Sequence, residues 1–293
     1  MKAKTTKFGE AVAGYLFLMP SFVGFIIFTG FPVIGSLLLS FSDWNMITPP
    51  VAVGLSNYQK LPSDPLLMQS LSNTAYFSLL SVPLNILLAL LLAILINNKL
   101  RGTNFLKAAY FLPTIYSTVA VALIWQWIYD YRTGLLNYFF GLIHLGPYPW
   151  LTSTKLAMIS VVGVAVWRGV GYNMLIFLAG LQGVSVDLYE AARIDGTNQW
   201  QMFWHVTVPM ISPSTFFVTI TSIINSFQVF DITTVLTAGG PGNATNTLVM
   251  LIYQHAFQFF RMGYASAIAY VLFGIVLVLT LIQTTLSKRW VHY

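Results

Sequence analysis

Polar side chains recur at helical spacing inside otherwise apolar segments of this 293-residue chain. In residues 211–230, Thr221, Asn225 and Gln228 follow Ser214 at intervals of seven, four and three. These intervals place the side chains on one face of a helix. Such a face presents uncharged hydrogen-bond donors and acceptors, so the chemistry it predicts is recognition of a polar solute rather than a covalent reaction.

Two further apolar segments carry groups of the same kind. They are Thr114, Ser117 and Thr118 in residues 108–128, and Arg168, Gly169, Tyr172 and Asn173 in residues 157–181. Amides and hydroxyls beside an aromatic ring suit a sugar, whose hydroxyls need partners and whose C–H faces stack on rings. The alternative is that these groups join neighbouring helices, at about 0.6 kcal/mol each. We favour that alternative for Ser117 and Ser214.

Arg168 is the unusual member of these groups, because a cation near the middle of a membrane helix costs about 2.5–3.5 kcal/mol on insertion scales. It is expected either to face the interior or a wet cavity, or to extend toward the outer interface. The sequence does not separate these interpretations. If the solute were anionic, Arg168 would be the first candidate ligand.

The chain lacks the motifs of catalysis on its own. No G-x-x-x-x-G-K-[ST] is present, and Gly239-Gly240-Pro241-Gly242 has no lysine after it, so it predicts a turn rather than a phosphate site. No G-x-S-x-G is present either. The histidines are His144, His205, His255 and His292, and no two lie within four residues of each other. The sequence therefore predicts no catalytic residue and no metal site, which argues against a membrane-embedded enzyme.

An ion-coupled secondary transporter of a small polar solute is the main alternative to be weighed. Such transporters usually need carboxylates inside the membrane to carry the coupling ion. The apolar segments contain no Asp or Glu, and Asp231 stands only at the end of residues 211–230. This absence favours energy supplied from outside the membrane.

The composition is that of a polytopic membrane protein. The chain is 57% hydrophobic and 8% charged, with a mean hydropathy of +0.74. Soluble domains carry about 25% charged residues, so this chain could not cover an aqueous surface. The net charge of +6 comes from scattered basic residues, which does not indicate nucleic-acid binding, and the absence of cysteine excludes a disulfide framework.

A helix needs about 20 apolar residues to cross the hydrocarbon core. Six segments meet this requirement: 12–39, 74–96, 108–128, 157–181, 211–230 and 265–286. The sequence thus predicts an all-α fold with six transmembrane helices in a single domain over 1–293. The loop 41–73 is expected to be irregular, forming an external lid or a short interfacial helix.

The distribution of lysine and arginine predicts the orientation of the chain. Nine lie on the side of the two termini and of loops 97–107 and 182–210: Lys2, Lys4, Lys7, Lys99, Arg101, Lys107, Arg193, Lys288 and Arg289. Four lie on the other side: Lys60, Arg132, Lys155 and Arg261. We therefore expect both termini and the loop 182–210 to be cytoplasmic.

Residues 187–209 form a polar and amphipathic island between two apolar runs, and they hold three of the eight acidic residues. Asp187 and Glu190 have the spacing of a capping box, which predicts a short helix. Gly196 suits a sharp turn after that helix. Trp200, Phe203 and Trp204 then predict a second amphipathic helix, and Pro209 and Pro213 return the chain to the membrane.

The same stretch resembles the EAA signature of ABC importer permeases. The match consists of Glu190, Ala191, Ala192, Gly196, Val206, Val208 and Pro209, with valines where Ile and Leu are more usual. Asp195, Phe203, Leu181-Gln182 and Gly239-Gly240-Pro241 also stand where such permeases have them. The resemblance covers about residues 15–290 and is closest to the carbohydrate-uptake subgroup, which includes the maltose F and glycerol-3-phosphate A permeases.

The resemblance implies a role for each group of residues. Loop 182–210 would be the coupling helix that docks in a cytoplasmic ATPase, with Glu190, Ala191, Ala192, Asp195 and Gly196 as its coupling residues. Thr118, Tyr172 and Asn225 align with sugar-facing positions, and Gly169 and Thr221 also align. With Gln228 and Arg168 they form the expected substrate path. Other positions differ in type, so the resemblance does not specify maltose.

The resemblance also implies the partners. They are a second homologous permease, two ABC ATPase subunits that bind ATP and Mg²⁺, and an extracytoplasmic substrate-binding protein. This chain itself would bind no cofactor. It would lie in the bilayer of a bacterial inner membrane and take up a sugar, oligosaccharide or related polyol.

Overall fold

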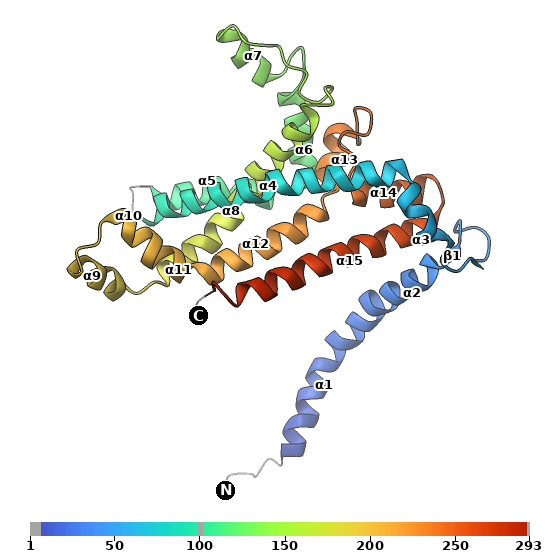
Figure 1. Cartoon of the computed structure of the whole chain (residues 1–293), viewed down its shortest axis with the longest axis horizontal. Helices are drawn as coiled ribbons and strands as arrows, with labels where there is room; N and C mark the ends of the chain where they lie inside the picture. The colour runs from blue at the N-terminus through green and yellow to red at the C-terminus, as the bar shows by residue number, and fades with distance from the viewer. Residues whose placement is uncertain (1–6, 99–101, 292–293) are drawn as a thin grey trace. The chain divides into compact units, whose positions relative to one another are not determined.

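The computed structural model describes residues 7–98 and 102–291 (Figure 1). Among these residues the fold is helical, apart from a two-stranded antiparallel pair, β1 (Ser42–Asp43) with β2 (Val51–Ala52). The predicted all-α class is therefore confirmed. The positions Lys2, Lys4, Lys99, Arg101 and His292, used or noted in the sequence analysis, lie outside the described residues.

The chain divides into two compact units, so each is treated by itself. Unit 1 comprises residues 1–63 and 252–270, and unit 2 comprises residues 64–251 and 271–293. Helix α15 (Met262–Ser287) begins in the first and ends in the second. The prediction of a single domain over 1–293 stays a prediction.

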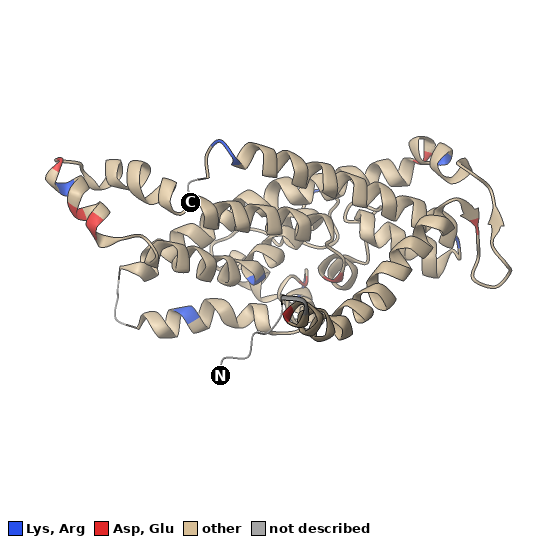
Figure 2. Cartoon of the chain, turned by 90° about the horizontal axis from the view of Figure 1, so that it is seen from below, with Lys and Arg blue, Asp and Glu red and all other residues tan. Residues whose placement is uncertain are grey.

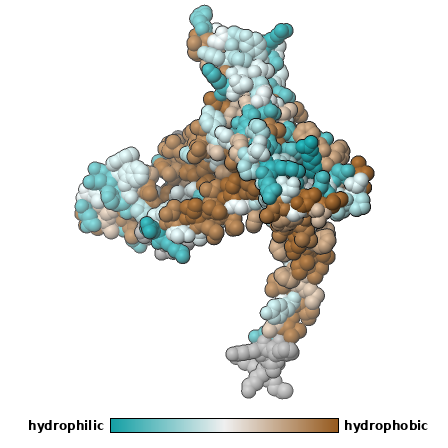
Figure 3. All heavy atoms as spheres, turned by 45° about the vertical axis from the view of Figure 1, so that its right-hand side comes forward, coloured by the Kyte–Doolittle hydropathy of each residue, from teal (hydrophilic) through white to brown (hydrophobic). Residues whose placement is uncertain are grey.

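Unit 1 begins with a long apolar helix. Helix α1 (Lys7–Phe25), a π-helical turn (Ile26–Gly30) and α2 (Phe31–Ser40) follow one another without interruption. Residues Gly9–Ser40 form a candidate membrane span, none of whose most apolar window is buried within the chain. Figure 3 shows hydrophobic residues over most of this helix. Because such a surface is unstable in water, it must be covered by lipid or by another protein.

Hydrogen bonds from an asparagine side chain stabilise the backbone at the C-terminal end of α2. The side-chain amide of Asn57, in the short helix α3 (Ser56–Lys60), donates to the carbonyls of Ser40 (2.9 Å) and Ser42 (2.8 Å). A Cβ at Gly263 would collide with the carbonyl oxygen of Ser42, so the start of α15 packs directly on this backbone. The expected short helix in loop 41–73 is present as α3.

The predicted irregular loop 41–73 ends earlier than expected. After a 3₁₀ turn (Leu61–Ser63), helix α4 runs from Pro65 to Asn97. It starts at Pro65 because the Asp64 carboxylate accepts from the backbone N–H groups of Leu66 (2.9 Å) and Leu67 (3.3 Å), and a proline is favourable in the first turn. The helix thus extends well beyond the predicted 74–96 span.

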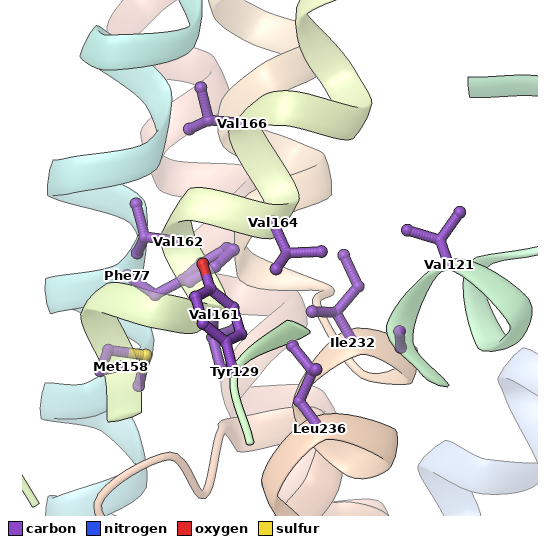
Figure 4. Packing of buried hydrophobic residues seen from close by; sticks show 11 residues of the cluster. Phe77, Val121, Tyr129, Met158, Val161, Val162, Val164, Val166, Ile232 and Leu236 are labelled. Atoms are coloured by element: carbon purple, nitrogen blue, oxygen red, sulfur yellow. The ribbon is translucent and has the colours of Figure 1, made fainter. Parts of the chain in front are cut away.

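Unit 2 is built around α4 and α8 (Ala157–Gln182). Ala89 and Ala93 of α4 belong to one buried cluster with Met174 and Phe177 of α8, and all four are fully buried. Small residues let helix backbones approach closely, which is how helices pack in a membrane. A second cluster joins Phe77 of α4, valines of α8 and Ile232 of α13 (Asp231–Thr237), as Figure 4 shows.

The predicted span 108–128 is broken rather than continuous. Helices α5 (Thr103–Ile115) and α6 (Thr118–Ile128) meet at an angle of 100°. The break lies at Tyr116 and Ser117, whose extended backbones (ψ 151° and 130°) end one helix and start the next. An average of hydropathy does not detect the break, because the two helices taken together are still apolar enough for one span.

The remaining predicted spans correspond to observed helices. Span 157–181 is α8, span 211–230 is mainly α12 (Ser212–Phe227), and span 265–286 is α15. Within residues 7–98 and 102–291, four helices are long and apolar enough to cross a membrane, and two bent pairs would raise the number to six if each is one span. A polytopic membrane architecture is therefore confirmed, while the orientation of the termini stays a prediction.

Short helices and a tight loop complete unit 2. Helix α7 (Leu135–Leu142) lies between α6 and α8, and α14 (Leu248–Tyr253) follows α13. In the loop between α13 and α14, Gly239 and Gly242 have positive φ (82° and 55°), as expected of a turn. The side-chain amide of Asn73 in α4 donates to the carbonyls of Asn243 (2.7 Å) and Asn246 (2.9 Å), which fixes this loop to the long helix.

Candidate functional site

A cavity of about 460 Å³ lies in unit 2, between α4, α6, α8, α12 and α13. Its lining includes every residue of the predicted substrate path: Thr118, Arg168, Gly169, Tyr172, Thr221, Asn225 and Gln228. These residues come from three segments of the sequence, and folding brings them to one place. Their contact with a substrate stays a prediction.

Helical geometry explains most of this convergence. Arg168 and Tyr172 stand one turn apart on α8, and Thr221 and Asn225 stand one turn apart on α12. Thr118 reaches the cavity for a different reason: it is the first residue of α6, just after the break in the predicted span. The break that the sequence analysis missed thus forms part of the cavity wall.

A buried hydrogen-bond network crosses the cavity wall. The side-chain amide of Asn173 in α8 donates to Oδ1 of Asn85 in α4 (2.7 Å) and to the hydroxyl of Ser222 in α12 (3.2 Å). The Asn85 amide donates to the carbonyl of Val166 (3.3 Å). A Cβ at Gly169 would lie 2.9 Å from Nδ2 of Asn85, so glycine leaves room for this amide. Three helices are joined by satisfied polar groups, which are stabilising in a dry interior.

The sequence analysis overlooked Asn85 and its neighbours, although a signal was present. Ser78, Ser81 and Asn85 recur at intervals of three and four inside an apolar segment, which is the pattern that identified α12. Ser81 and Asn85 line the cavity, and the Ser78 hydroxyl is hydrogen-bonded to that of Ser226 in α12 (2.7 Å).

Arg168 lies in the cavity wall. Its side chain is half-buried, and its Nε is fully buried with no hydrogen-bond partner in the described part of the chain. Its own carbonyl accepts from the Thr114 hydroxyl (2.7 Å), which ties α8 to α5 at this point. Asp231, which the sequence placed only at the end of a span, is exposed and lines the same cavity.

The second candidate site is the loop 182–210, called here the elbow. It consists of α9 (Val186–Ile194), a turn at Gly196, α10 (Gln199–Met202), a π-helical turn (Phe203–Thr207) and α11 (Val208–Met210). The predicted helix–turn–helix is therefore present. Gly196 has φ 75°, a value that glycine adopts without strain.

The start of α9 differs from the prediction. The N-cap is Ser185, whose hydroxyl accepts from the backbone N–H of Asp187 (3.2 Å), so Asp187 is inside the helix rather than at its cap. The extended backbone of Ser185 (ψ 136°) provides the cap geometry two residues earlier than predicted. A capping box does occur in the elbow, but it joins Asn198 and Gln201 at the start of α10.

Internal contacts hold the elbow in one shape. The Thr197 hydroxyl donates to the Ala192 carbonyl (2.6 Å), and the Gly196 N–H donates to the Arg193 carbonyl (3.0 Å). The hydroxyls of Tyr189 and Thr207 are 3.1 Å apart, linking α9 to the π-helical turn. Because these internal hydrogen bonds make the elbow rigid, it can transmit a movement that a flexible loop would absorb.

The coupling residues predicted in the elbow are accessible. Glu190, Ala191, Asp195 and Gly196 are exposed, and Ala192 is half-buried. Figure 2 shows that the elbow carries acidic and basic residues, whereas the long helices are mostly without charge.

The elbow joins the membrane helices through a bend of 64° between residues 199–210 and α12. Trp200, Phe203 and Trp204 form the predicted aromatic stripe, with ring centroids 5.2–6.2 Å apart. The rings of Phe216 in α12 and Trp290 just after α15 have centroids 6.4 Å apart, so α15 ends near the elbow.

The described residues contain no group of three His, Asp or Glu side chains able to hold a metal ion.

The carboxylate of Asp130, which lies outside the helices, is stabilised in its charged form by hydrogen bonds. Hydrogen bonds from the backbone and hydroxyl of Thr133, and from the backbone of Arg132, hold the pKa of Asp130 below its ordinary value. This group orders the turn between α6 and α7 and lies outside the cavity lining.

Comparison with known proteins identifies close relatives. Residues 69–292 match the model of a family described as binding-protein-dependent transport system inner membrane component. The chain is 37% identical to the arabinooligosaccharides transport system permease protein AraP of Bacillus subtilis, over 96% of this chain and 90% of AraP. It is 34% identical to the trehalose/maltose transport system permease protein MalF of Thermococcus litoralis, over 96% of each.

A solved structure has the same fold. It is a bacterial alginate ABC transporter in complex with an alginate pentasaccharide-bound periplasmic protein, and one of its chains superposes with a TM-score of 0.84. The match covers 96% of this chain and 95% of that chain at 23% identity.

Proposed function

The chain belongs to the family of binding-protein-dependent transport system inner membrane components, and from this premise we propose that it forms one half of the path by which a sugar, oligosaccharide or related polyol crosses the membrane. It is a permease subunit of an ABC importer in the inner membrane and not itself an enzyme. As in the sequence analysis, we treat residues 1–293 as one permease domain that contains the elbow.

The observation that carries this proposal is the cavity. Its lining combines amides and hydroxyls with the rings of Tyr172 and Phe77, which is the chemistry that a sugar requires. The names of AraP and MalF refer to arabinooligosaccharides and to trehalose and maltose, which supports a carbohydrate substrate for this chain. In this proposal Asn225 and Tyr172 contact the sugar, with Thr118, Thr221 and Gln228 beside them.

The elbow is proposed to connect the cavity to an ATPase. Glu190, Ala191 and Asp195 present an exposed surface on a helix held in one shape, and Gly196 sets the turn behind it. One of two ABC ATPase subunits, which bind ATP and Mg²⁺, would dock here on the cytoplasmic side, and the other would dock on the second permease. When they close on ATP, the elbow would move α12 and open the cavity outward. Hydrolysis would return it to the inward-open state.

Two further partners are proposed because this chain would form only one half of the substrate path. A second homologous permease would supply the opposite wall of the path, and an extracytoplasmic substrate-binding protein would deliver the sugar. The alignment with a transporter solved in complex with its periplasmic protein supports such an assembly. The apolar surface of Gly9–Ser40 fits lipid or the second permease.

The test is to purify the tagged chain from its native membrane and to reconstitute what accompanies it. We expect an ATPase to copurify, and ATP hydrolysis and sugar uptake to rise when the loaded substrate-binding protein is added. Uptake by the chain alone under an ion gradient, without ATP, would contradict the proposal and favour the secondary transporter. The exposed Asp231 in the cavity makes this control necessary.

A further inference from the structure

The cavity is mostly neutral but contains one half-buried cation. Of the residues that line it, only Arg168 and Asp231 carry charge. Asp231 is exposed and lies in the first turn of helix α13, where water can reach its carboxylate and the helix dipole favours a negative charge. Arg168 has no such environment, because its Nε is fully buried without a hydrogen-bond partner among the described residues.

Arg168 and Asp231 form no ion pair within the described structure, and the Arg168 backbone is fixed by the Thr114 hydroxyl at 2.7 Å. A guanidinium whose Nε is buried without a partner gains a charge-assisted hydrogen bond when an anion reaches it. The other polar groups of the lining, such as Asn85, Thr118 and Asn225, are uncharged amides and hydroxyls.

We propose that Arg168 binds the carboxylate of an acidic sugar, so that the importer carries uronic-acid oligosaccharides. This inference rests on the proposed function of the cavity as a sugar path. A guanidinium offers two parallel N–H donors that match the two oxygens of a carboxylate. Tyr172, one turn along α8, and Asn225 on α12 line the same cavity and would contact the ring and hydroxyls of the same sugar unit.

A carboxylate fits this cavity better than a phosphate ester. A phosphate monoester carries a charge of about −1.5 to −2 near neutral pH and usually requires several donors. The cavity lining supplies one cation and also contains the Asp231 carboxylate, which would repel a second negative charge. The lining offers one guanidinium for one carboxylate, and the exposed Asp231 carboxylate remains available to accept hydrogen bonds from sugar hydroxyls.

The experiment uses the complete importer in proteoliposomes, with the same substrate-binding protein throughout. The probes are disaccharides of galacturonate, glucuronate and mannuronate, the methyl ester of each, and a neutral disaccharide. The ester keeps the sugar skeleton and removes the charge, so comparing acid with ester tests the wild-type protein without any substitution. The affinity of the binding protein for each probe is measured separately, so that its own preference can be divided out.

In the wild-type importer we expect at least one acid to be taken up more efficiently than its ester after this correction. Arg168→Gln should lower the acid-to-ester ratio by about 10- to 100-fold, which is the range of a hydrogen bond to a charged group. Arg168→Lys should retain part of the ratio, because lysine keeps the positive charge but lacks the two parallel N–H donors of the guanidinium. Arg132→Gln, an exposed arginine outside the cavity lining, should leave the ratio unchanged.

Two results would overturn the inference. One is uptake of neutral sugars by the wild-type importer with no preference for any acid over its ester, which would leave the proposed function standing. The other is an acid preference that Arg168→Gln does not alter. If the wild-type importer moves no sugar of any kind, the proposed function fails as well, so the two failures are distinguishable.

Discussion

Replacing Gly196 tests whether the shape of the elbow is what couples this chain to an ATPase. Gly196 has φ 75°, and a Cβ built at this position meets nothing within 4 Å. Gly196→Ala therefore introduces backbone strain without a clash. Gly196→Pro has a larger effect, because proline fixes φ near −65° and removes the N–H that donates to the Arg193 carbonyl at 3.0 Å.

The two substitutions should differ in size. The left-handed conformation costs an ordinary residue about 1–2 kcal/mol, so Gly196→Ala should weaken association with the ATPase by at most about 5- to 30-fold. With Gly196→Pro the turn cannot form, and we expect ATPase association and uptake to fall by more than about 100-fold. Insertion into the membrane should be normal for both, because the elbow lies outside the apolar helices.

The assay measures copurified ATPase and ATP-driven uptake at equal amounts of inserted chain. Gly54→Ala is the matched control, because Gly54 also has positive φ (57°) and open space around it but lies in unit 1, outside the elbow. It should leave both readouts unchanged. Wild-type ATPase association and uptake by Gly196→Pro would refute the reasoning.

Three further predictions concern the cavity and one external turn. Asn225→Ala or Tyr172→Ala should raise the sugar concentration for half-maximal uptake by about 2- to 10-fold with assembly intact, and unaltered kinetics in both would reject the path assignment. Asn173→Ala removes two interhelical hydrogen bonds and should lower the free energy of unfolding, measured by SDS titration, by about 1–2 kcal/mol; an unchanged value would mean that the network is not stabilising. Because the pKa of Asp130 is lowered, mainly by hydrogen bonds from Thr133, its turn should be fully stabilised above the usual aspartate pKa and lose this stabilisation as pH falls through the folded value. Hydrogen exchange of the Thr133 amide should report this loss, which Asp130→Asn should abolish.

Much of the fold was accessible from the sequence because a membrane imposes simple requirements. Long apolar runs identified α8 and α15 within a few residues. Gly196 predicted the turn inside the elbow, and Pro209 and Pro213 predicted where the chain leaves the elbow for the next membrane helix. Helical periodicity also grouped Thr221 and Asn225 on the face that lines the cavity. In each case one residue type or one spacing determines the local structure.

Other features depend on contacts between distant segments, which periodicity does not encode. The 100° break at Tyr116 and Ser117 has the hydropathy of a continuous span. Its neighbouring helix α5 is held where the Tyr110 carbonyl contacts Gly171, a position that no side chain could share. Similarly, Asn85 gains its importance only when α8 brings Asn173 within 2.7 Å.

The central claim is that the elbow docks on a nucleotide-driven partner, and a single introduced cysteine tests it most directly. The chain has no native cysteine, so Ala191→Cys places one reactive thiol on the exposed surface of α9. In native membranes we predict a crosslink from this thiol to an ABC ATPase whose yield changes when ATP is added. Val51→Cys, exposed in the outer strand pair, should give none. Failure of Ala191→Cys to crosslink to any ATPase, in membranes that still take up the sugar, would contradict the account.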